Sequence, residues 1–130
     1  MPDSPFPASE QPGVIVVTTP DEIDIGNAAL LREAMLAAAQ QQPRILVVDM
    51  TGTEFCDSTG LNVLVRAQKQ AQQEGRELCL AVRGSALQRI LAVSGVDGMF
   101  RIYDSLAGAL DAESGAPAPD PPSPERAAAD

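Results

Sequence analysis

Histidine is absent from this chain of 130 residues, and its absence removes several classes of functional site. Without an imidazole the chain cannot form a Ser-His triad, a histidine-ligated metal site or a phosphohistidine. The sequence also contains neither a G-x-x-x-x-G-K-[ST] loop nor a G-x-G-x-x-G turn, the two common loops that cradle nucleotide phosphates. We therefore predict a protein that is not an enzyme and that holds no metal ion and no cofactor of its own.

Basic residues are scarce. The chain has 9 Lys and Arg against 18 Asp and Glu, which gives a formal net charge of −9 at pH 7. Nucleic acids and anionic membranes are themselves negative, so we expect neither as a partner and instead expect a protein that offers basic contacts. No stretch approaches the roughly 20 apolar residues of a membrane helix, and the N-terminus lacks the pattern of a signal peptide.

Cysteine is also rare. Cys56 and Cys79 each lie in an apolar stretch, and two cysteines are too few to suggest a disulfide framework. We interpret them as buried free thiols of a reducing compartment, which predicts a cytoplasmic location.

The two ends of the chain differ in composition from its middle. Residues 1–12 are rich in Pro, Ser and acidic residues, and residues 114–130 are rich in Pro and Ala. Such segments cannot bury enough apolar surface to fold, so we expect an irregular or disordered N-terminal segment and a disordered tail. Residues 13–113 are then predicted to form a single domain.

Strand-like and helix-like segments alternate within that domain. Runs of β-branched and aliphatic residues predict strands at 14–18, 45–50, 77–82 and 100–103. Apolar residues at helical spacing predict helices that begin near Asn27, Ser58, Ser85 and Asp104. The alternation predicts an α/β fold with a mostly parallel four-stranded sheet and about four helices.

Polar residues mark the expected start of each helix. Asn27 and Asp104 are predicted N-caps, and Ser85 with Gln88 matches a capping box. Gly75 suits the left-handed position that follows a last helical turn, so the second helix is expected to end there.

The tetrapeptide Asp57-Ser58-Thr59-Gly60 is the candidate functional site, because it places a hydroxyl where a buried strand leads into a helix. Functional surfaces of open α/β sheets gather at the carboxyl ends of the strands, and the loops 21–27 and 54–60 both lie there. Ser58 has no base beside it, so it is better suited to accept a modification than to act as a nucleophile. The alternative is that Asp57 or Ser58 merely caps the helix.

Asp49 also ends a predicted strand, which is the place of the phosphoacceptor in a receiver domain. A phosphoaspartate site needs further carboxylates for magnesium and a cation beside the phosphate. The first strand ends without an acidic pair and no Lys ends the third. We therefore interpret Asp49 as a hydrogen-bond acceptor of its loop.

The stretch 48–61, which contains the tetrapeptide, closely resembles the D-S-[ST]-G-[LV] signature of the STAS domain in anti-sigma factor antagonists. Asp21-Glu22-Ile23-Asp24 is similar to the G-E-[IL]-D turn of that family. The segments 87–96 and 100–105 resemble its third helix and its closing strand and cap. The resemblance covers about residues 14–112.

The resemblance implies a domain that binds an anti-sigma factor, itself a serine kinase, and so releases a sigma factor. The kinase would use its own ATP to phosphorylate Ser58 and switch the antagonist off, and a phosphoserine phosphatase would restore it. The partner-binding residues implied by the family motif are Asp24, Asn27, Asp57, Ser58, Thr59 and Gly60.

The chain departs from the family pattern at two places. Asp21 stands where the family usually has Gly, which weakens the transfer of a role to Asp24. Members usually open with an additional strand, whereas the prolines of residues 1–12 predict that this strand is short or missing. The edge along 14–18 would then be exposed and is a candidate contact for a weak homodimer.

A constitutive interaction module with a STAS fold is the alternative function. It would serve as a scaffold or as an accessory subunit of a transporter, and its Ser58 would never be phosphorylated.

Overall fold

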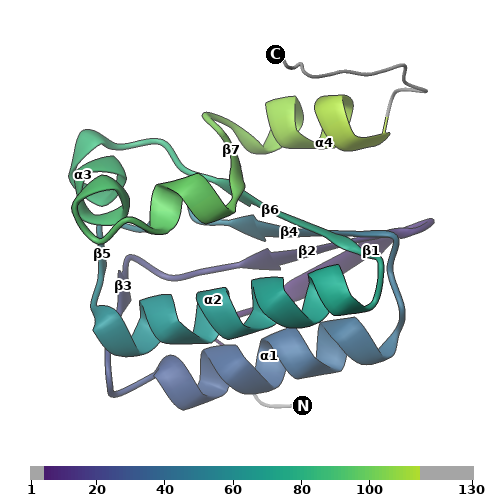
Figure 1. The fold of residues 1–130 in the computed structure, drawn as a ribbon, viewed down its shortest axis with the longest axis horizontal. Helices are drawn as coiled ribbons and strands as arrows, with labels where there is room; N and C mark the ends of the chain where they lie inside the picture. The colour runs from purple at the N-terminus through teal and green to yellow at the C-terminus, as the bar shows by residue number, and fades with distance from the viewer. Residues whose placement is uncertain (1–4, 115–130) are drawn as a thin grey trace.

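Parallel strands form the centre of the molecule. The computed structural model describes residues 5–114. Its main sheet has the strand order β1-β2-β4-β6-β7, with bounds Ala8–Gln11, Val14–Thr18, Ile45–Asp49, Glu77–Ala81 and Arg101–Tyr103. Every neighbouring pair is parallel except β1 and β2 (Figure 1). The four predicted strands are therefore present, and the predicted α/β fold with a mostly parallel sheet is confirmed.

The N-terminal strand β1 contradicts the expected irregular segment. It pairs antiparallel with β2 in the register Ala8 to Val17, and Phe6, just before it, is only 2% exposed. The prolines at 5, 7 and 12 flank β1 instead of interrupting it, so its ladder remains intact. Because β1 covers the outer edge of β2, the exposed edge expected along Val14–Thr18 does not exist, and the homodimer contact based on it loses its support.

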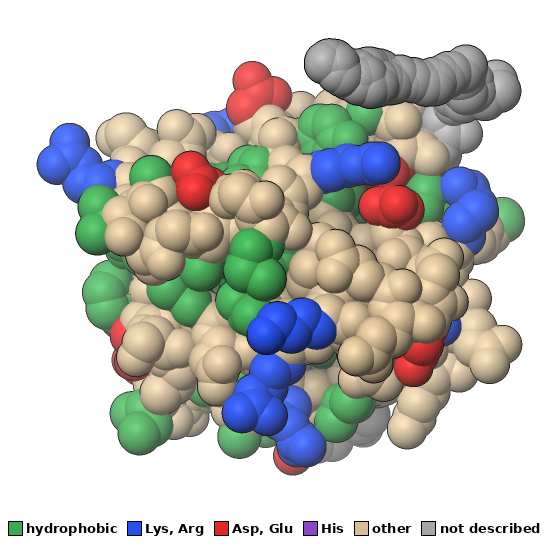
Figure 2. All heavy atoms as spheres, viewed as in Figure 1, with side chains coloured by type: hydrophobic (Ala, Val, Ile, Leu, Met, Phe, Trp, Pro, Cys, Tyr) green, Lys and Arg blue, Asp and Glu red, His purple; other side chains and the backbone are tan. Residues whose placement is uncertain are grey.

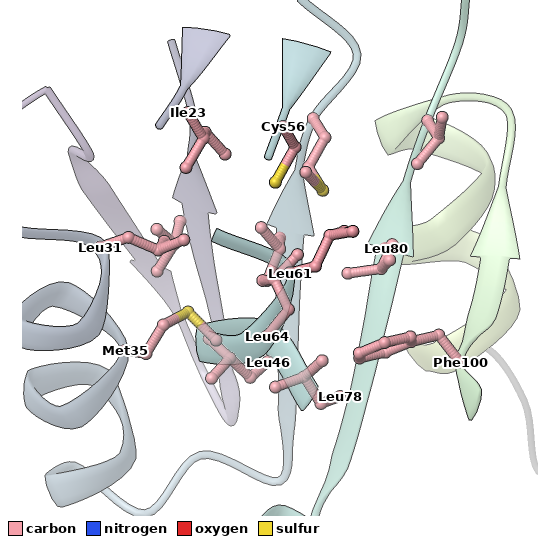
Figure 3. Close-up of a cluster of buried hydrophobic side chains, with 14 of the residues drawn as sticks. Ile23, Leu31, Met35, Leu46, Cys56, Leu61, Leu64, Leu78, Leu80 and Phe100 are labelled. Carbon is pink, nitrogen blue, oxygen red and sulfur yellow. The ribbon is translucent and has the colours of Figure 1, made fainter. Parts of the chain in front are cut away.

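Three helices cover one face of the sheet. They are α1 (Ala28–Gln40), α2 (Ser58–Gln73) and α3 (Ser85–Val93), and a 3-10 turn follows at Val96–Met99. Their apolar faces meet the sheet in one core, which includes Leu31 and Met35 from α1, Leu61 and Leu64 from α2, and Phe100 (Figure 3). The spacing of these apolar residues is the helical pattern read from the sequence, and tertiary packing has selected the same faces.

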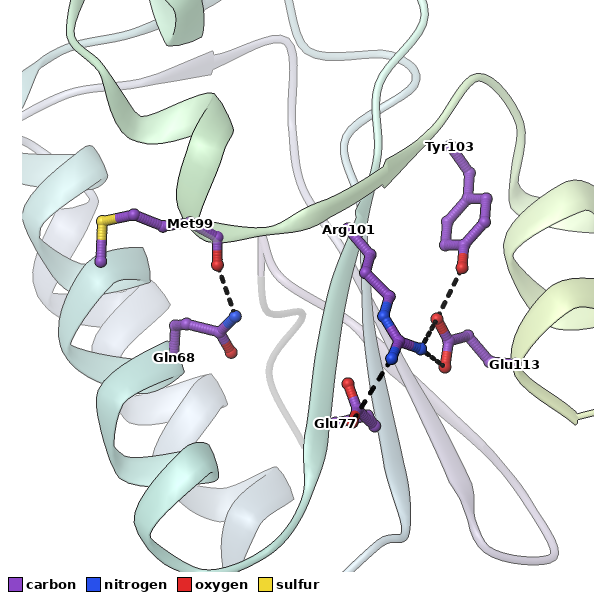
Figure 4. A network of polar contacts seen from close by, with 6 residues as sticks. All are labelled: Gln68, Glu77, Met99, Arg101, Tyr103 and Glu113. Carbon is purple, nitrogen blue, oxygen red and sulfur yellow. Dashed lines mark hydrogen bonds and ion pairs between the residues drawn. The ribbon is translucent and has the colours of Figure 1, made fainter. Parts of the chain in front are cut away.

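The last helix, α4 (Leu106–Ser114), packs against the opposite face. Ala109 of α4 lies in a second, smaller core with Val47 and Cys79. Polar contacts hold its end in place, since Glu113 accepts a hydrogen bond from Tyr103 at 2.6 Å and pairs with Arg101 at 3.1 Å (Figure 4). The sheet is thus covered on both faces, as a parallel sheet requires.

The predicted caps of α3 and α4 are wrong. Helix α3 begins at Ser85 itself, with Gly84 at the cap position and no side-chain cap, so the capping box of Ser85 and Gln88 does not form. At the start of α4 the Ser105 hydroxyl, and not Asp104, accepts a hydrogen bond from the Gly108 N–H at 2.9 Å. In both places the chain starts its helix one residue away from the expected position.

No helix within residues 5–114 is long and apolar enough to cross a membrane. The predicted disorder of residues 115–130 lies outside the described residues.

Candidate functional site

Two loops that are far apart in the sequence are joined at the carboxyl ends of the parallel strands. A short two-stranded sheet, absent from the sequence-based expectations, pairs β3 (Glu22–Ile23) with β5 (Phe55–Cys56). The Asp57 N–H then donates to the Ile23 carbonyl at 3.0 Å. Figure 1 shows β3 and β5 beside the first turns of α1 and α2. The predicted meeting of the loops 21–27 and 54–60 is therefore present, and β-pairing produces it.

Asp57 is the N-cap of α2. Its backbone is extended, and its carboxylate accepts hydrogen bonds from the N–H groups of Thr59 at 3.0 Å and of Gly60 at 3.2 Å. The Thr59 hydroxyl donates to the same carboxylate oxygen. This hydroxyl is the main reason that the pKa of Asp57 lies below its usual range, with help from the N–H groups of Gly60, Thr59 and Ile25. Of the two residues that could cap the helix, Asp57 is therefore the cap, and Ser58 does not occupy the cap position.

Ser58 is the first residue of α2 and is exposed to solvent. Thr59, beside it, is half-buried and its hydroxyl is engaged by Asp57. Of the two adjacent side chains, that of Ser58 is the more exposed to a second protein.

Asp24 and Asn27 form a braced turn between β3 and α1. The Asn27 side chain accepts from the Asp24 N–H at 3.0 Å and donates to the Glu22 carbonyl at 2.9 Å. The Asp24 carboxylate accepts from the Gly26 N–H at 2.9 Å. Asn27 occupies the cap position of α1 but makes no side-chain cap bond, so its predicted capping role is corrected to that of a brace within the turn.

Gly60 is required by close packing under the site. A Cβ at this position would lie 2.6 Å from Ile23 Cγ2 and 2.7 Å from Cys56 Sγ, both of which belong to the β3–β5 pair. Ile23 and Cys56 point into the core together (Figure 3). The small residue therefore lets the first turn of α2 lie directly against the strands that join the two loops.

A buried pair of threonines supports the loops from below, and sequence reasoning missed it. Thr19 and Thr53 share a hydrogen bond between their hydroxyls, and the Thr53 hydroxyl also donates to the Pro20 carbonyl at 2.6 Å. Asp49 accepts hydrogen bonds from the N–H and hydroxyl of Thr51, at 3.1 and 2.7 Å, which agrees with its interpretation as a loop acceptor. The sequence did not indicate a role for Thr19 and Thr53, because only the fold shows that the two side chains are buried.

Exposed apolar side chains flank the site and were also missed. Ile25 is 81% exposed in the turn before α1, and Phe55 in β5 is 45% exposed. The sequence carried no signal for the exposure of Ile25, because Ile23 lies between Glu22 and Asp24 and is nevertheless fully buried. Large exposed apolar side chains beside a polar group are a feature of protein contact surfaces.

The surroundings of Ser58 are acidic. The loops that meet here carry five carboxylates, those of Asp21, Glu22, Asp24, Glu54 and Asp57. Among residues 5–114 no cluster of three or more His, Cys, Asp or Glu side chains is suited to hold a metal ion. The site is thus an exposed hydroxyl in an acidic rim.

Comparison with known proteins identifies this arrangement. The family model of the STAS domain matches residues 6–109. The anti-sigma-F factor antagonist RsfB of Mycobacterium tuberculosis is 34% identical over 98 residues, which cover 75% of this chain and 80% of that protein.

Solved structures agree with this assignment. The crystal structure of an anti-sigma factor antagonist from Mycobacterium paratuberculosis is 32% identical, with a TM-score of 0.75 over 82% of this chain and 91% of that one. A sulfate transporter family protein from Wolinella succinogenes, at 22% identity and a TM-score of 0.66 over 77% of this chain and 84% of that one, shares the fold alone. The relatives from Mycobacterium tuberculosis and Paenibacillus polymyxa are both named as antagonists of an anti-sigma factor. The chain therefore belongs to the STAS domain family, and within it to the anti-sigma factor antagonists.

Proposed function

We propose that this protein binds an anti-sigma factor that is also a serine kinase, and that phosphorylation of Ser58 switches the binding off. The unphosphorylated form releases a sigma factor, and a phosphoserine phosphatase restores that form. The kinase supplies the ATP, and the exchange takes place in the cytoplasm. The observation that carries the proposal is the exposed Ser58 hydroxyl at the first position of α2, between two loops that are held together.

The hydrogen bonds of the site favour Ser58 as the acceptor over its neighbour. A kinase must reach the hydroxyl and remove its proton, and the Thr59 hydroxyl is half-buried and already donates to Asp57. Ser58 is exposed. The two hydroxyls are adjacent in sequence, yet Ser58 is the more accessible of the two residues.

A phosphate on Ser58 would change the partner surface more than the fold. It adds about −1.5 to −2 charges at pH 7. Helix N-termini usually accommodate anions, but here the Asp57 carboxylate already takes the N–H groups of Thr59 and Gly60. The added charge therefore remains beside the carboxylate of Asp57, in the acidic surroundings of the two joined loops. A partner surface fitted to a neutral hydroxyl then meets both repulsion and the cost of desolvating a dianion.

The apolar side chains beside Ser58 supply contact area that phosphorylation does not alter. Phe55 is exposed on β5, and Ile25 is exposed in the turn between β3 and α1. We expect them to lie in apolar pockets of the partner, while the acidic rim pairs with basic side chains.

Phosphorylation is tested by incubating the protein with ATP and candidate anti-sigma kinases of the same genome. Mass spectrometry should place one phosphate on Ser58, and Ser58→Ala should remove it while Thr59→Ala retains a phosphate on Ser58. Phosphate elsewhere, or none with any candidate, would favour the constitutive interaction module.

Binding to a kinase that passes this test is measured with phosphomimetic variants. Ser58→Ala should keep the affinity of the original chain, and Ser58→Asp should weaken it at least tenfold, about 1.4 kcal/mol. Gln73→Glu adds the same charge at the exposed opposite end of α2 and should have little effect. Equal affinities for Ser58→Ala and Ser58→Asp would exclude the switch.

A further inference from the structure

A pocket lies between α1 and α2, away from Ser58, and it combines an apolar floor with a basic rim. Its volume is about 220 Å³. The floor contains Met35 from α1, Leu46 from β4, Leu78 from β6, and Ala67 and Ala71 from α2. Ala67 and Ala71 face the pocket one turn apart, and their small side chains leave room that a leucine at either position would occupy.

Three arginines line the same pocket: Arg32 on α1, Arg66 on α2, and Arg76 just before β6. This is unexpected in a chain with a net charge of −9. Figure 2 shows Lys and Arg side chains gathered over α1 and α2 in the lower centre of the view. Three of the nine basic residues of this acidic chain thus line one pocket, while Figure 2 shows other Lys and Arg side chains elsewhere on the surface.

In the described part of the chain, the carboxylates near the pocket pair with Arg76 but not with Arg32 or Arg66. Glu77 is the one acidic residue of its lining, and it pairs with Arg101 at 3.8 Å, outside the pocket (Figure 4). Arg76 pairs with Glu74. Within residues 5–114, Arg32 and Arg66 form no salt bridge. Two guanidinium groups therefore stand at the rim with their hydrogen-bond donors available.

The size and polarity of the pocket define a class of ligand. A cavity of about 150 Å³ is enough to hold benzene, so this pocket takes a somewhat larger apolar body, such as a short acyl chain. Guanidinium groups bind carboxylates through paired, charge-assisted hydrogen bonds. A ligand that meets both requirements has an apolar body and one carboxylate at its end.

We propose that the pocket between α1 and α2 binds a small amphiphilic carboxylate, with its apolar part on the floor of Met35, Leu46 and Ala67 and its carboxylate at Arg32 and Arg66. This site is separate from Ser58 and does not depend on the proposed phosphorylation. Both helices that line it begin at the loops around Ser58, but the binding itself needs no change there.

Octanoate is the probe for this proposal, with octanol and octylamine as matched neutral and cationic compounds. Titration into the full chain, followed by the backbone amide signals in NMR spectra, should give saturable changes at residues of α1 and α2 that line the pocket. Octanol should bind about tenfold more weakly, because it loses the charge-assisted hydrogen bonds, and octylamine more weakly still. Equal affinities for the three compounds, or shifts centred elsewhere, would overturn the proposal.

Amino-acid substitutions in the pocket test the same proposal. Arg66→Gln and Arg32→Gln should each weaken octanoate binding severalfold while leaving octanol binding unchanged. Arg89→Gln, an exposed substitution on α3 outside the pocket, should alter neither. Ala67→Leu should block both ligands, and a thermal unfolding curve establishes that this variant is folded. Full octanoate binding by folded Ala67→Leu would also contradict the assignment.

Discussion

Single residues of the site have separate roles, although the motif presents them as a unit. Asp57 caps α2, Gly60 permits close packing, Thr59 orients Asp57, and Ser58 is exposed. Ser58 is therefore the member that can change without loss of the fold. The other members hold the loop in the conformation that displays Ser58.

Gly60→Ala should destabilise the protein, because its Cβ would lie 2.6 Å from Ile23 and 2.7 Å from Cys56. Overpacking of this kind costs about 1–3 kcal/mol. Urea denaturation measures the loss. Gly52→Ala is the control, since a Cβ there meets nothing within 4 Å and its effect should stay within about 1 kcal/mol. Equal stabilities of the two variants would contradict the role given to Gly60.

Asp57 should make stability depend on pH. Its pKa is lower in the folded protein than in the unfolded chain, mainly because of the Thr59 hydroxyl. The ionised carboxylate therefore favours folding at neutral pH, and this contribution is lost as the pH falls below about 4 and through the lowered pKa. Asp57→Asn cannot ionise, so the stability difference between the original chain and this variant should shrink between pH 7 and pH 3. A difference that is constant over this range in denaturation experiments would argue against the lowered pKa.

Short elements, more than long ones, determine the form of the site. The pair β3–β5 has only two residues in each strand, yet it joins the loop before α1 to the loop before α2. Strand β1 is also short, with four residues, and it covers the edge of β2. Strands β3 and β5 pair across a long stretch of sequence, so a local pattern does not reveal them, whereas β1 pairs with the strand that directly follows it.

The first turn of α4 offers a test at the level of one element. Because the Ser105 hydroxyl accepts the Gly108 N–H, Ser105→Ala should lower the free energy of unfolding by about 1 kcal/mol. Asp104→Ala should change it by less than about 0.5 kcal/mol. The comparison uses chemical denaturation of both variants, and a larger loss for Asp104→Ala would restore the cap predicted from the sequence.

At the scale of the whole molecule, two cores lie on opposite faces of one sheet. Cys56 belongs to the core under α1, α2 and α3, and Cys79 to the smaller core under α4. Both thiols are free and buried, as the sequence predicted. Burial raises the pKa of each to about 12, and nearby carboxylates add to the effect.

Thiol reactivity should therefore report opening of the fold. A thiol whose pKa rises from 9.0 to about 12 has about a thousandfold less thiolate at neutral pH. We expect Ellman's reagent to label neither cysteine rapidly in the native protein and to label both at once in urea. Cys56→Ser and Cys79→Ser assign any slow native reaction to one core, and rapid native labelling of either thiol would contradict the burial described here.

Much of the fold was predictable because its signals are local. Runs of β-branched and aliphatic residues predicted four strands, apolar residues at helical spacing predicted four helices, and Asp57-Ser58-Thr59-Gly60 predicted a hydroxyl at a helix start. The predictions that failed concern partners. Asn27 was expected to cap its own helix, but it braces the turn instead, and β1, which was expected to be short or missing, is a four-residue strand paired with β2.

The sequence by itself determined the order of the four parallel strands and the four helices, the acidic charge and the position of Ser58, since each depends on neighbouring residues or on composition. Only the tertiary structure decided that β3 and β5 pair, that Thr19 and Thr53 support the loops, and that three arginines of an acidic chain surround one pocket. These features join residues of distant segments, and their geometry exists only once the helices have packed against the sheet.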